Sequence, residues 1–84
     1  YTDQIIDLIK SNDGKAFNQI RQLVADSNIR DYNELYRALF ENLDSFHNSV
    51  LGTIIIAESQ YQSVMAPDKE ITFMGCIANL IKPF

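Results

Sequence analysis

Apolar side chains at helical spacing fill the last third of this chain, from Ile54 to Ile81. They recur every three or four residues on both sides of Pro67, which predicts two helices separated by a proline-containing turn. The stretch contains no catalytic or phosphate-binding motif. We therefore expect it to be packing surface, in a part of a protein that holds other parts together.

Composition limits what the chain can be. Its 84 residues allow one domain at most, and a hydrophobic fraction of 46% is typical of a globular protein rather than a disordered tail. The net charge is −4 and the seven Lys and Arg residues are scattered, which argues against direct binding of nucleic acid. Cys76 is the only cysteine, so no internal disulfide can form and a reducing compartment is the simpler interpretation.

No apolar run approaches the ~20 residues that a membrane span needs. The longest unbroken run is residues 54–57, so we expect no membrane partner. The chain begins at Tyr1 rather than Met, and we expect no signal peptide. A fragment of a longer polypeptide is the expected origin, with processing of the chain as the alternative.

The helical period continues along the whole chain and predicts an all-α fold, a compact bundle of about five helices. The helices are expected at residues 3–10, 15–26, 31–43, 50–64 and from about 67 to 81. Gly14 is expected in a left-handed conformation after the first helix. Asp31 with Glu34 resembles a capping box, and Asn48 or Ser49 can cap the fourth helix. Residues 44–49 are expected to form a polar connector.

The fourth helix has apolar residues around most of its circumference, at Ile54, Ile55, Ile56 and Ala57. Three consecutive β-branched residues also suit a strand. The helical spacing extends on both sides of them, however, and excludes that alternative. We expect this helix to be the central and most buried one.

Candidate chemistry is sparse. His47 is the only histidine, and with Cys76 it does not make a zinc site. Cys76 has apolar neighbours and is expected to be a buried, unreactive thiol. Asp3 and Asp7 share a helix face, as do Glu41 and Ser45, and we expect solvated polar surface rather than acid–base catalysis. No phosphate-binding loop is present, so no catalytic, cofactor or metal residue is predicted.

The run from Ile56 to Leu80 resembles the end of the C-terminal domain of clamp-loader ATPase subunits. These include the replication factor C small subunits and the phage T4-type clamp-loader large subunit. The family pattern is an apolar helix with a Glu, an aromatic and a small residue, then a polar turn, then a helix that opens with Ile or Leu. The matching positions are Glu58, Tyr61, Ala66, Asp68, Ile71, Phe73, Ala78 and Leu80.

The first half is similar to the same family, in residues 5–24 and 31–43. The chain departs from the family at Ala66, where Gly is common, at Pro67, and at Met74, which replaces a polar or small residue. These departures concern interface contacts more than the fold.

The resemblance implies that residues 1–84 form a single collar domain, the C-terminal part of a longer AAA+ protein. In that family, collar domains pack side by side into a ring-like lid. The lid holds the subunits together while they load a sliding clamp onto primer–template DNA during DNA replication. ATP, Mg²⁺, the clamp and the DNA bind to the preceding modules. The fragment alone is then not an enzyme, binds no cofactor, and acts in the cytoplasm of a bacterial or phage-infected cell or in a nucleus.

The last two predicted helices offer more apolar positions than one internal face can hide, so some should meet a neighbouring subunit. We predict that the following residues are partly interfacial: Ile55, Tyr61, Phe73, Met74 and Ile81. Two alternatives are a free-standing helical adaptor that binds a partner peptide, and a small enzyme or ligand-binding bundle that uses Asp residues and His47.

Overall fold

The computed structural model describes residues 1–11, 14–46 and 48–81. Within these ranges the chain forms α-helices α1 (Thr2–Ser11), α2 (Ala16–Ser27), α3 (Tyr32–Glu41), α4 (Ser49–Met65) and α5 (Lys69–Ile81), and a 3₁₀ turn η1 (Leu43–Ser45). The described residues contain no β-strand, so the predicted all-α bundle of about five helices is confirmed.

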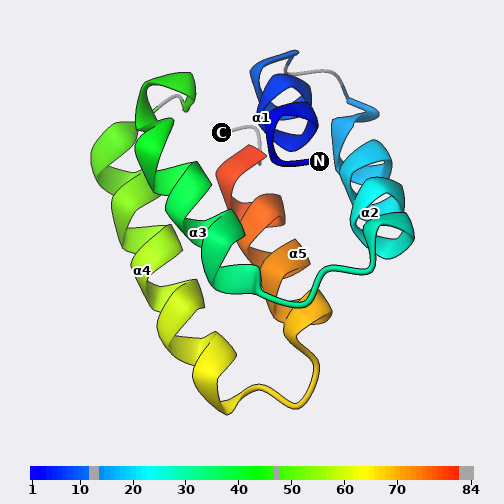
Figure 1. The fold of residues 1–84 in the computed structure, drawn as a ribbon. Helices are drawn as coiled ribbons and strands as arrows, with labels where there is room; N and C mark the ends of the chain where they lie inside the picture. The colour runs from blue at the N-terminus through cyan, green and yellow to red at the C-terminus, as the bar shows by residue number, and fades with distance from the viewer. Residues whose placement is uncertain (12–13, 47, 82–84) are drawn as a thin grey trace.

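Helix α5 runs through the middle of the molecule (Figure 1). Helices α3 and α4 lie on one side of it, and α1 and α2 lie on the other. Helices α4 and α5 form an antiparallel pair joined by a short turn, and α4 also packs against α3. The packing therefore places α4 at the edge of the bundle, with α5 and α3 as its main neighbours.

The ends of several helices are fixed by the caps that the sequence predicts. The Asp31 carboxylate accepts a hydrogen bond from the Asn33 amide at 2.9 Å. The Asn48 side chain accepts one from the Leu51 amide at 3.0 Å. Each side-chain oxygen satisfies an amide in the first turn that has no partner within the helix, which is how a polar residue starts a helix.

Helix α2, expected at residues 15–26, spans Ala16–Ser27, and the left-handed residue lies at its end rather than after α1. Asn28 is the residue in the left-handed conformation, with φ of 50°, and it ends α2. Gly14 has no positive φ, so the expectation of a left-handed glycine there is wrong. Residues 12 and 13, which were expected to end the first helix with Gly14, lie outside the described residues.

The core contains side chains from all five helices and is centred on α5. Phe73 is fully buried, and its ring lies 5.6 Å from the rings of both Tyr32 and Tyr36. Aromatic pairs at this separation and inclination add to the stabilisation that burial gives. The other largest fully buried side chains are Ile5, Ile20, Val24, Leu35, Leu39, Cys76 and Ile77.

The expectation that the fourth helix is the most buried one is wrong. Only four residues of α4 are buried, Gly52, Ile56, Ser59 and Ser63, and just one of them is a large apolar residue. Helix α5 takes the central position and buries Phe73, Met74, Cys76 and Ile77. Apolar composition shows that a helix has surface to bury, but it does not show which neighbour covers that surface.

Candidate association surface

The outer face of α4 is formed by large apolar side chains at helical spacing. Val50, Ile54, Ala57, Tyr61 and Val64 follow one another at intervals of four, three, four and three residues, so they share one face. The four large ones have exposed fractions between 48% and 78%. We call these five residues the α4 stripe. A surface helix normally shows charged and polar residues on this side, so the stripe is unusual.

The inner face of α4 carries mostly small side chains. Gly52, Ser59 and Ser63 lie there with Ile56, on the opposite side of the helix from the stripe. A Cβ atom at Gly52 would come within 3.4 Å of Leu43 and 3.5 Å of Phe46, which shows how closely α4 approaches the turn η1. Small inner residues allow α4 to pack closely, and its large apolar residues are left outside.

Two further apolar residues near the end of α4 are exposed. Met65, next to Val64 in the last turn, is 81% exposed, and Ile71 in the first turn of α5 is 70% exposed. Isolated exposed apolar residues are common, but a continuous set of them marks a protein or membrane contact. No helix in the described part of the chain is long and apolar enough to cross a membrane.

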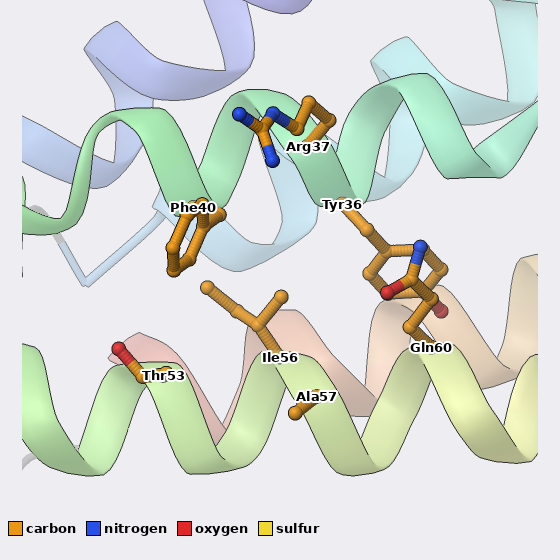
Figure 2. A pocket seen from close by; sticks show the side chains of 7 residues that line it. All are labelled: Tyr36, Arg37, Phe40, Thr53, Ile56, Ala57 and Gln60. Carbon is orange, nitrogen blue, oxygen red and sulfur yellow. The ribbon is translucent and has the colours of Figure 1, made fainter.

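A groove between α3 and α4 lies beside the stripe (Figure 2). Its volume is about 270 Å³. The lining residues are Tyr36, Arg37 and Phe40 from α3, and Thr53, Ile56, Ala57 and Gln60 from α4. Ala57 belongs to both the groove and the stripe, so the two features are continuous.

Arg37 is the only charged residue among the described residues that line the groove. Its guanidinium lies 5.4 Å from the centre of the Phe40 ring, and its Nε lies 3.7 Å from a carboxylate oxygen of Glu41. Both partners of this ion pair are well exposed, so the pair contributes little and leaves the guanidinium able to take another partner. On α4, Glu58 is the single charged residue.

The structure places the five predicted interface residues differently from one another. Tyr61 is highly exposed, while Ile55 and Ile81 are partly buried against the core. Phe73 is 0% exposed and Met74 is 8% exposed, so neither presents surface to a neighbour. The expected exposure of these two is corrected, because Phe73 packs against Tyr32 and Tyr36 of α3 and Met74 belongs to the buried core. A subunit contact at Ile55, Tyr61 and Ile81 stays a prediction.

The sequence did not single out Val50, Ile54 and Val64 as interface candidates, although it gave their spacing. The fourth helix as a whole was expected to be the most buried one, so its apolar residues were not divided between an inner and an outer face. The signal that could have separated them is the opposite face, where Gly52, Ser59 and Ser63 recur at the same period. A face of small residues packs closely, and a face of large ones on the same helix must then point away.

The chemistry of Cys76 and Tyr36 is that of buried groups. The Cys76 thiol is buried, and burial raises its pKa, although a hydrogen bond with the Ser59 side chain opposes the rise. Burial also raises the pKa of Tyr36 to about 12, with the neighbouring Cys76 adding to the effect. Raised pKa values keep both groups protonated and unreactive at neutral pH.

The remaining polar candidates lie at the surface or outside the described residues. Asp3, Asp7 and Glu41 are exposed, and no group of three or more potential metal ligands occurs within residues 1–11, 14–46 and 48–81. His47 lies outside the described residues. No family model, curated protein or solved structure matches this chain in comparisons with known proteins.

Proposed function

We propose that this chain is an association domain that holds subunits together through the outer face of α4. The observation that carries the proposal is the reversed pattern of α4, which has large apolar residues outside and mostly small residues inside. The exposed large residues of the stripe are Val50, Ile54, Tyr61 and Val64. Helix α4 has 17 residues, and one of them is charged. Apolar surface with so little charge is typical of the centre of a protein interface.

We further propose that the subunits are those of a clamp-loader ATPase and that this chain is a collar domain. The support is the resemblance of residues 56–80 to that family, together with a helical bundle that has an apolar outer face. In this proposal the domain contributes no catalytic group. ATP and Mg²⁺ bind to AAA+ modules of the parent protein, which meets the clamp and DNA where replication takes place.

Sedimentation equilibrium of the chain, alone and mixed with partner clamp-loader subunits, tests the association. Replacing Ile54 with Asp puts a charge at the centre of the stripe, where desolvating it is costly. We expect Ile54→Asp to weaken association at least tenfold, by about 1.4 kcal/mol or more. Helical content should not change, because Ile54 is half exposed and outside the core cluster.

Ala25→Asp is the matched control, since Ala25 is exposed on α2 and the change adds the same charge. It should associate like the unmodified chain. Equal association of Ile54→Asp and Ala25→Asp would contradict the proposal.

A free-standing adaptor would use the same face of α4 to bind a partner peptide. The two candidates differ in the coding sequence before Tyr1. An ATP-binding Walker motif there would support the clamp-loader proposal, and an unrelated or absent preceding module would support the adaptor.

A further inference from the structure

The groove of the proposed association surface is large enough to receive a side chain of the stripe. The stripe is a row of protruding side chains, while the groove beside it is a hollow of about 270 Å³ with Ile56 and Ala57 among its apolar lining residues. A cavity of about 150 Å³ accommodates a benzene ring, so this groove has room for an aromatic or branched side chain. Tyr61 and Ile54 of the stripe are side chains of that size.

The two features also carry complementary charge. Arg37 is the only charged residue among the described residues of the groove, and Glu58 is the only charged residue of α4. Glu58 is exposed and lies four residues after Ile54 and three before Tyr61, so it is the neighbour of both on the helix surface. A side chain of the stripe that entered a groove would bring Glu58 close to the guanidinium at the groove's edge.

The environment of Arg37 fits such a contact. Its ion pair with Glu41 is long, at 3.7 Å, and exposed. Figure 2 shows Arg37 on α3, with Phe40 and Tyr36 of the same helix nearer to α4, and all three line the hollow. Across an interface, complementary charges of this kind set register and partner choice more than affinity.

We infer that the partner is a second copy of this domain, an inference that rests on the association function proposed above. The α4 stripe of one copy enters the α3–α4 groove of the other. Glu58 of the first copy then pairs with Arg37 of the second. Each copy then offers both halves of the contact. Such a contact between unlike surfaces permits either a reciprocal pair or a continuing row.

Two charge reversals test this inference when they are combined in a mixture. Arg37→Glu alone places two acidic residues opposite each other in every contact between copies, and Glu58→Arg alone places two basic ones. Both variants should associate about threefold to tenfold more weakly than the unmodified chain. In an equimolar mixture each groove meets a stripe of opposite charge, so association should return to the unmodified value.

Sedimentation equilibrium at low and high salt is the measurement, with Arg21→Glu and Asp7→Arg as controls. Arg21 is exposed on α2 and Asp7 is exposed on α1. Arg21→Glu makes the same charge change as Arg37→Glu, and Asp7→Arg makes the same charge change as Glu58→Arg. The controls and their mixture should show neither the loss nor the recovery. The difference in association strength between the single variants and their mixture should become smaller at high salt, because salt screens exposed charges.

Two results would overturn the inference. One is a chain that stays monomeric at about 1 mM, the concentration at which even a contact of about −4 kcal/mol is half formed. The other is a mixture that associates no better than its components. If Ile54→Asp still abolishes binding to other subunits in either case, the proposed function stands and only the identity of the partner is wrong.

Discussion

Tyr36 has a buried hydroxyl that makes no hydrogen bond within the described residues. A buried polar group without a partner loses its hydration and gains nothing in return. Its ring nevertheless packs against Phe73 at 5.6 Å and fills the space between α3 and α5. Tyr36 therefore stabilises the fold through its ring, while its hydroxyl lowers the stability.

Tyr36→Phe is expected to raise the free energy of unfolding by about 1 kcal/mol at neutral pH, because it removes the unsatisfied hydroxyl and keeps the ring. For a chain of this size that corresponds to a rise in Tm of about 4–8 °C, measurable by thermal unfolding followed by circular dichroism. A fall in Tm would show that the hydroxyl has a stabilising partner.

The same residue makes the stability depend on alkaline pH. Burial raises the pKa of Tyr36 from 10.0 to about 12, so between these values the folded chain keeps a proton that the unfolded chain has lost. The contribution of Tyr36 to stability is full below pH 10 and is lost as the pH rises toward 12, by about 2–3 kcal/mol for a shift of two units. The fall should be smaller in Tyr36→Phe, with Tyr32 and Cys76, whose pKa values are also raised, accounting for the rest.

At the scale of the helix, α5 and not α4 is the central, most buried helix, although the sequence suggests the reverse. Both are rich in apolar residues, and the hydrophobic period gives their positions and nearly all of their lengths. Period alone does not orient a helix with apolar residues on all sides. The orientation of α4 depends on Gly52, Ser59 and Ser63, whose small side chains allow close packing on neighbouring helices.

The caps at Asp31 and Asn48 were predictable because each needs only residues close in sequence. The groove was not predictable, because it depends on how α3 and α4 lie against each other over residues far apart in the chain. The burial of Phe73 and Met74 escaped prediction for the same reason. A sequence shows that these residues are apolar, but only the packing of α5 between its neighbours shows that they are enclosed.

Two truncations distinguish the core helix from the stripe. Phe73→Ala removes a fully buried ring and should lower the free energy of unfolding by about 3–5 kcal/mol, enough to unfold much of a small domain. Val64→Ala, on the exposed stripe, should change it by no more than about 0.5 kcal/mol. Urea unfolding measures both, and similar losses would show that α4 is packed differently.

At the scale of the whole molecule, the chain encloses one core and leaves a second apolar surface uncovered. The core is filled by α1, α2, α3 and α5 with Ile56 from α4, while the α4 stripe faces outward. A domain of 84 residues gains little margin from its own core, so apolar surface left outside is costly unless a partner covers it. Association through α4 would bury the stripe and remove this cost.

Hydroxyl-radical footprinting tests the burial of the stripe most directly. It compares the dilute chain with the same chain at a concentration where it, or its complex with other subunits, assembles. Tyr61 and Met65 are 78% and 81% exposed in the single chain, and Tyr1, at 46%, provides an internal reference away from α4. We predict that assembly reduces the labelling of Tyr61 and Met65 severalfold and leaves Tyr1 unchanged. Equal labelling of Tyr61 and Met65 in the dilute and the assembled protein would contradict the account.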